Sequence, residues 1–87
     1  MLRIHRLANG EVVFALSGQM DQESVTELET LIKSEPNGSR LALDLKDVTL
    51  ANQDAINFLE RWETNGITLK NCPAYIREWI NAQRRQS

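Results

Sequence analysis

Strand-like and helix-like hydrophobic patterns alternate along this chain, and their alternation limits its fold more than any other feature. The run Leu41-Ala-Leu-Asp-Leu45 is short and almost wholly apolar, as is typical of a strand in the centre of a sheet. Helix-like periodicity precedes this run and returns after it. Strands joined by helices imply parallel pairing and right-handed crossovers. The pattern therefore predicts an α/β fold.

The N-terminal segment predicts a β-hairpin. Leu2 and Ile4 alternate with charged or polar residues, which is typical of a half-buried strand. The dipeptide Asn9-Gly10 is a strong signal for a tight turn. The apolar, β-branched stretch 11–17 follows that turn and supplies the second strand.

The first helix is predicted from an N-cap at Asp21 to about Ser34. Its apolar positions recur at helical spacing and predict one buried stripe. The residues of this stripe are Val25, Leu28, Leu31 and Ile32. The stretch 35–39, with Pro, Asn and Gly, predicts a loop before the apolar run.

A second helix is expected to begin at the N-cap Asn52, after a short loop that contains Asp47. Gly66 is suited to the left-handed position that ends this helix. The predicted buried stripe consists of Ala55, Ile56, Leu59 and Trp62, with Phe58 beside it.

The C-terminal part predicts a short strand over 67–71 and a final helix. Pro73 fits the first helical position, and Asn71 or Cys72 could cap the helix. Its apolar side consists of Ile76, Trp79 and Ile80, with Tyr75 nearby. The expected order is β-β-α-β-α-β-α, which describes a single domain over 1–87 with a mixed four-stranded sheet and helices packed on it.

Charge and cysteine content narrow the function classes. The net charge of −2 gives no whole-molecule argument for binding nucleic acid. No apolar stretch approaches the roughly 18–20 residues of a membrane helix, and the N-terminus lacks the apolar run of a signal peptide. A single cysteine cannot form an intrachain disulfide. We therefore expect a cytoplasmic protein, monomeric or weakly dimeric, without membrane insertion.

Two catalytic or metal-binding hypotheses rest on isolated residues. Cys72 at a helix start could be a nucleophile, and its base would have to be His5, the one histidine of the chain. Asp44, Asp47 and Asp54 could form the acidic cluster of a phosphoaspartate receiver. Asp44 alternates with leucines, however, so it should face away from the core. The sequence has no Cys/His pair with metal-ligand spacing and no Gly-rich phosphate loop, so we expect no metal and no cofactor.

Three segments resemble the STAS domain, the fold of bacterial anti-sigma-factor antagonists. They are VVFALSGQMDQESVTELETLI, RLALDLKDVTLANQDAINFLERW and GITLKNCPAYIREWI. The first is similar to the family's L-x-G-x-L-D followed by a helix. The second is similar to its D-L-x-x-V step and the loop that opens the next helix. The resemblance extends from Glu11 to about Ala82.

The resemblance implies a role for the first turn of the second helix. In the family, the motif Asp-Ser-Ser/Thr-Gly caps this helix, and its second hydroxyl residue accepts a phosphate from a partner kinase. Here Asn52 stands at the Asp, Gln53 at the first Ser, Asp54 at the phosphoacceptor and Ala55 at the Gly. The motif keeps no hydroxyl, so Asp54 resembles a permanent, smaller charge.

The function implied by the resemblance is that of a non-catalytic regulatory module in bacterial signalling and transcription regulation. Its partner would be an anti-sigma kinase-like regulator. Alternatively, the chain would be a small accessory subunit that binds the ATPase of a lipid-transport ABC system. The expected partner-binding residues are Gln19, Asp21, Asn52, Gln53, Asp54, Asn57 and Phe58. Phosphate on Thr49 or Ser17 would mean that the switch has moved to another residue.

Overall fold

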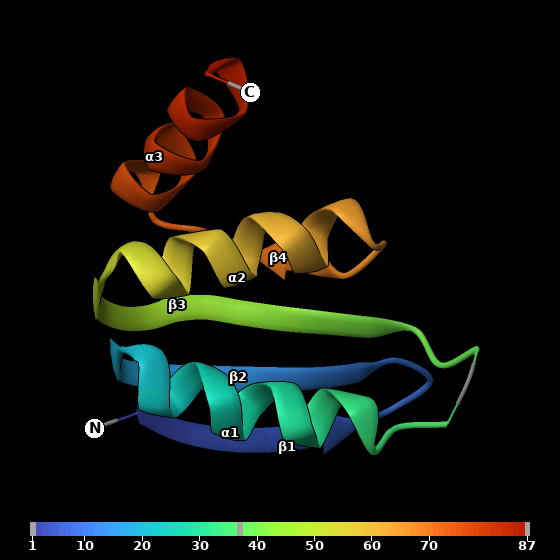
Figure 1. Ribbon diagram of the computed structural model, residues 1–87. Helices are drawn as coiled ribbons and strands as arrows, with labels where there is room; N and C mark the ends of the chain where they lie inside the picture. The colour runs from blue at the N-terminus through green and yellow to red at the C-terminus, as the bar shows by residue number, and fades with distance from the viewer. Residues whose placement is uncertain (1, 37, 87) are drawn as a thin grey trace.

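The computed structural model describes residues 2–36 and 38–86. It confirms the predicted α/β class, the mixed four-stranded sheet and the element order (Figure 1). The elements are β1 (Leu2–Ala8), β2 (Val12–Met20), α1 (Gln22–Lys33), β3 (Leu41–Ala51), α2 (Gln53–Thr64), β4 (Thr68–Lys70) and α3 (Ala74–Arg85).

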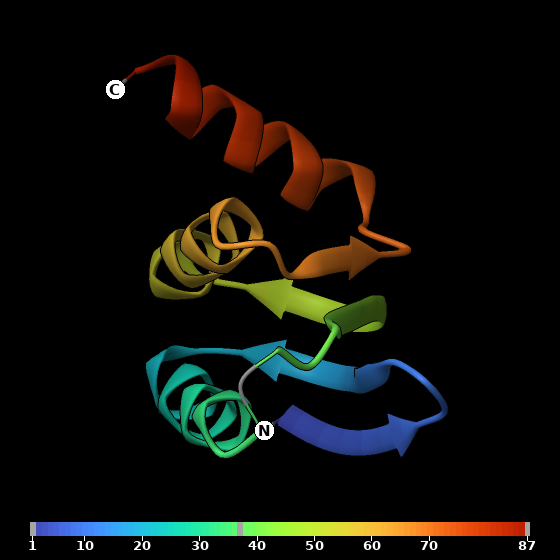
Figure 2. The same ribbon diagram turned by 90° about the vertical axis from the view of Figure 1, so that its right-hand side faces the viewer.

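The sheet has the strand order β1-β2-β3-β4. The hairpin strands β1 and β2 pair antiparallel, whereas β2–β3 and β3–β4 pair parallel. Helices α1 and α2 cover one face of the sheet, and α3 lies beyond the β4 edge against α2 (Figure 2). Among the described residues, no helix covers the opposite face, which we call the open face.

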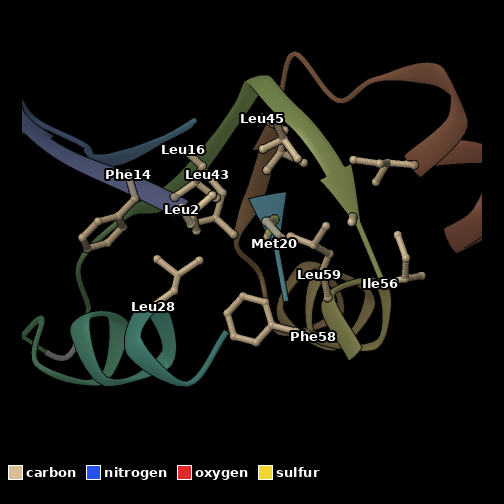
Figure 3. Packing of buried hydrophobic residues seen from close by; sticks show 14 of the residues in the cluster. Leu2, Phe14, Leu16, Met20, Leu28, Leu43, Leu45, Ile56, Phe58 and Leu59 are labelled. Atoms are coloured by element: carbon tan, nitrogen blue, oxygen red, sulfur yellow. The ribbon is translucent and has the colours of Figure 1, made fainter. Parts of the chain in front are cut away.

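The core lies between the sheet and the two crossover helices. Figure 3 shows strand side chains such as Phe14 and Leu43 pointing into the same interior as Leu28 of α1 and Phe58 of α2. The largest fully buried side chains are Phe14, Phe58, Leu16, Met20, Leu28, Leu43, Leu45, Ile56, Leu59, Ile76 and Ile80. Burial of one such side chain stabilises the fold by roughly 1.5–3 kcal/mol.

The first two helices begin where the sequence predicts. Asp21 and Asn52 are the N-caps of α1 and α2, and each side chain accepts a bond from a backbone N–H of its helix. Gly66 has φ +101° after α2, a conformation that an L side chain rarely adopts. It therefore supplies the predicted left-handed turn into β4.

The predicted loop around Asp47 is wrong, because β3 continues to Ala51 and contains Asp47 and Thr49. The long strand β2 offers pairing partners along this whole stretch. Register shifts between Ala15 and Ser17, and again after Gly18, interrupt the alternation. A bulged strand loses the period-2 pattern from which a strand is recognised.

Three further predictions need correction. β4 has three residues and is shorter than the predicted 67–71. Pro73 is the N-cap of α3, not its first helical residue, and α3 has no side-chain cap. Leu31 is 37% exposed, because it lies at the margin of the α1 stripe and not over the sheet.

Ion pairs attach α3 to the end of α2. Arg77 donates to both carboxylate oxygens of Glu63 at 2.9 and 2.8 Å, and Arg84 lies 2.9 Å from one of them. Arg77 and Arg84 therefore hold the C-terminal helix α3 to α2 through one shared carboxylate. Hydrogen bonding from Arg77 holds the pKa of Glu63 below its usual value, against the opposing effect of burial.

We predict that Glu63→Gln lowers the free energy of unfolding by about 1 kcal/mol at neutral pH, the upper end for exposed ion pairs. Because the folded-state pKa of Glu63 lies below 4.5, its contribution is complete above that pH. It is lost as the pH falls through the folded-state pKa. Urea unfolding of both proteins at pH 7 and pH 3 measures this difference.

The matched control is Glu27→Gln, an exposed carboxylate on α1. It should change the free energy of unfolding little at either pH. A Glu63→Gln deficit as large at pH 3 as at pH 7 would show that the ion pairs do not cause it.

We predict that Leu59→Ala lowers the free energy of unfolding by about 2–5 kcal/mol, since Leu59 is completely buried. Leu31→Ala is the control, because its side chain is partly exposed on α1 and should cost less than about 1 kcal/mol. Chemical denaturation followed by circular dichroism measures both. Equal losses for the two variants would contradict the packing described here.

Candidate functional site

The candidate site lies where β2 and β3 end. Because these strands are parallel, the residues after them leave the sheet at the same edge, and α1 and α2 both begin on the left of Figure 1. The backbone N–H of Asn52 donates to the carbonyl of Met20 at 3.2 Å and joins the two strand ends. The two predicted helix starts, at Asp21 and Asn52, therefore lie next to each other. We call this part of the surface the corner.

Asp21 is held in place by Ser24. Its carboxylate oxygen Oδ1 accepts from the Ser24 backbone N–H and lies 2.9 Å from the Ser24 hydroxyl as well. These hydrogen bonds lower the pKa of Asp21, with the backbone bond as the largest cause. Ser24 is buried, and it was not predicted as a site residue. An Asp cap followed three residues later by a hydroxyl residue was the available signal.

Gln53 connects the first turn of α2 to α3. Its side-chain amide donates to Asn57 Oδ1 at 2.9 Å and to Gln83 Oε1. Gln83 in turn donates to Glu60 at 3.2 Å. Together with the bond from the Ala55 N–H to Asn52 Oδ1 at 3.0 Å, these contacts connect the first turn of α2 to its N-cap and to α3.

Three predicted site residues differ in exposure. Asp54 and Asn57 are exposed on α2. Phe58 is only 1% exposed and packs against Trp62 with ring centroids 5.7 Å apart. Its assignment to the partner-binding surface is therefore corrected to a core position, because the helix turns residue 58 toward the sheet.

A groove between α2 and α3 adjoins the corner, and the sequence did not predict it. Its lining residues are Gln53, Asn57, Trp79, Ala82, Gln83 and Gln86. Trp79 is half-buried at this groove and does not lie wholly in the core. The groove depends on how α3 packs on α2, which local patterns do not specify.

No protein-family model and no curated protein matches this chain. The kind of partner that the corner could bind must therefore be inferred from the functional groups that it exposes. It presents two adjacent helix N-termini, amide groups that donate and accept hydrogen bonds, and the exposed carboxylate of Asp54. For Asp54 the structure records no hydrogen bond or ion pair with another described residue. Such a surface can recognise a partner by hydrogen bonds and charge.

The Cys72–His5 pair is not formed. His5 lies on β1 and Cys72 follows β4, at opposite edges of the sheet. Burial above all raises the pKa of the Cys72 thiol, which favours the protonated and less nucleophilic form. The geometry does not support nucleophilic chemistry by these two residues.

The aspartates do not gather into one cluster. Asp44 and Asp47 pair in register with Ala15 and Ser17, whose side chains lie on the open face. Asp54 lies on α2, on the other side of the sheet. Within residues 2–36 and 38–86, no group of three or more His, Cys, Asp or Glu side chains could hold a metal ion. In the same part of the chain, no helix is long and apolar enough to cross a membrane.

Proposed function

We propose that this chain is a non-catalytic, cytoplasmic protein-interaction module that resembles a STAS-type anti-sigma-factor antagonist and acts in signalling or transcription regulation. Its binding surface is the corner, which we define by the residues Gln19, Asp21, Asn52, Gln53, Asp54 and Asn57. The partner is an anti-sigma kinase-like regulator that reads this surface.

The observation that carries the proposal is the exposed Asp54 in the first turn of α2. In the STAS resemblance this is the phosphoacceptor position. The N-terminus of a helix favours a negative charge, so a carboxylate is stable there without a kinase. A carboxylate carries about −1, whereas a phosphate carries about −1.5 to −2 and has three acceptor oxygens. Asp54 therefore supplies a fixed charge instead of a switch.

The contacts around Asp54 support binding by a preorganised surface. Asn52 caps the helix, Asp21 is tied to Ser24, and Gln53 is tied to α3 through Gln83. Side chains already ordered in the free protein lose less entropy on binding. The fixed charge also excludes partners that require a neutral hydroxyl, because burial of an unpaired charge is costly.

We predict that Asp54→Asn weakens or strengthens partner binding at least tenfold, or about 1.4 kcal/mol. The free energy of unfolding should change by less than about 1 kcal/mol, as expected for a helix-dipole effect. The partner is first isolated from native lysate by pull-down and identified by mass spectrometry. Calorimetric titration of both proteins at two salt concentrations then measures the affinity.

Glu78→Gln is the control, because it removes one exposed carboxylate from α3 without touching the corner. Equal affinities for wild type, Asp54→Asn and Glu78→Gln would leave Asp54 with a helix-stabilising role only. Recovery of an ABC ATPase in place of a kinase-like regulator would favour the accessory-subunit function. Phosphopeptide mapping of the native protein tests whether Ser17 or Thr49 is modified.

A further inference from the structure

The open face lies away from the helices and carries a regular pattern of charge. Three of its four strands are parallel, and parallel sheets are usually covered on both faces. Paired residues in a sheet share a face, so the register defines rows across it. The rows are Arg3–Ser17–Asp47, His5–Ala15–Asp44–Lys70 and Leu7–Val13–Ala42–Thr68.

The ionisable groups of the open face lie on three strands. β1 contributes Arg3 and His5, β3 contributes Asp44 and Asp47, and β4 contributes Lys70, which forms an ion pair with Glu11 at 2.6 Å. Between β1 and β3, β2 contributes the small side chains of Ala15 and Ser17. A shallow hollow lies over this centre, and Arg3, His5 and Asp47 are among its lining residues.

A bulge makes the pattern possible. Ala15 of β2 pairs with Asp44 of β3, and Ser17 pairs with Asp47. The step is two residues on β2 but three residues on β3. The extra residue in β3 keeps both aspartates on the open face, whereas strict alternation would have turned one of them inward.

Arg3, His5 and Asp47 have no partner of their own among the described residues, whereas Asp44 has two. Between described residues, the structure records no hydrogen bond or ion pair for the side chains of Arg3, His5 or Asp47. Asp44 accepts from the backbone N–H of Lys46 and from Asn71. Leu7 is 50% exposed at the end of the same face. The charges of Arg3 and Asp47 are therefore available to a group outside the chain.

We propose that a second copy of this chain packs on the open face, with a twofold axis that runs along β2. Such an axis reverses the strand order of the second copy and keeps the position of each residue along the strands. β1 of one copy therefore lies over β3 of the other. In the two charged rows, Arg3 faces Asp47 of the second copy, and His5 faces Asp44 of the second copy.

The remaining contacts of the pair are compatible with close packing. Ala15 and Ser17 each meet their own counterparts near the axis, and their small size lets the sheets approach to the usual distance of about 10 Å. Every charged pair forms twice, because the interface is symmetric.

The contact area sets the expected affinity. Three overlapping strands, about 4.8 Å apart and about seven residues long, cover on the order of 300–400 Å² per copy. A standard interface buries about 800 Å² per partner, so the dimer should be weak, with a Kd in the micromolar range. The proposal does not depend on the partner-binding function of the corner, since five of the six corner residues lie at the N-caps of α1 and α2 or on α2 and not in the sheet.

Charge reversal tests the pairing. Sedimentation equilibrium of wild type from about 10 µM to about 1 mM should reveal a monomer–dimer equilibrium. Arg3→Glu alone and Asp47→Arg alone should each raise the Kd at least tenfold, because each places like charges together at both symmetric contacts. The double variant Arg3→Glu/Asp47→Arg should restore a Kd within about threefold of wild type.

Exposed charges on α3 and α1 provide matched controls. Arg85→Glu and Glu27→Arg make the same charge changes away from the open face and should leave the Kd unchanged. A wild type that stays monomeric throughout would overturn the proposal and leave this face to another protein or to solvent. Single variants without effect, or a double variant without rescue, would also overturn it. A double variant without rescue would indicate that two copies pair through their β1 edges, where Arg3 and Asp47 do not meet.

Discussion

The parallel pairing of β2 with β3 determines where the corner and the open face lie. A parallel pair needs a crossover, and the right-handed connections β2-α1-β3 and β3-α2-β4 advance across the sheet in one direction. Both crossover helices therefore lie on the same face, and both begin at the same edge. The corner and the open face are two consequences of this one arrangement.

The two surfaces differ in how their polar groups are satisfied. At the corner, Asp21 is bonded to Ser24, and Gln53 is bonded to Asn57 and Gln83. This network connects the beginnings of α1 and α2 to neighbouring parts of the chain. On the open face the charges of Arg3 and Asp47 lie on separate strands and are not joined to each other. The corner thus presents hydrogen-bonding groups that are already paired within the chain, together with the carboxylate of Asp54, whereas the open face presents the unpaired charges of Arg3 and Asp47.

Local interactions explain which features the sequence predicted. The N-caps at Asp21 and Asn52 depend on bonds to a residue three positions away, so a short window contains them. The length of β3 depends on pairing with β2 and on a bulge, which no window around Asp47 contains. The burial of Phe58 depends on which side of α2 meets the sheet. A stripe of apolar residues predicts a buried face but not its edges, as the exposed Leu31 shows.

The contacts that hold α3 against α2 could not be predicted from short stretches of sequence either. Arg77 reaches Glu63 and Gln53 reaches Gln83, across 14 and 30 positions of the chain. Neither pair could be found without the packing of α3 on α2. The groove beside the corner, and the half-buried position of Trp79 in it, follow from the same packing.

The shifted pKa values of three carboxylates follow from contacts that hold the elements of the fold together. Hydrogen bonds that hold the fold together explain the lowered pKa values of Asp21, Glu35 and Glu63: Asp21 caps α1, Glu35 joins the end of α1 to Arg6 of β1, and Glu63 holds α3. Burial explains the raised pKa of Cys72. Catalytic groups are usually perturbed in a cleft by partners that poise them for reaction, whereas these groups are perturbed by the contacts that build the structure.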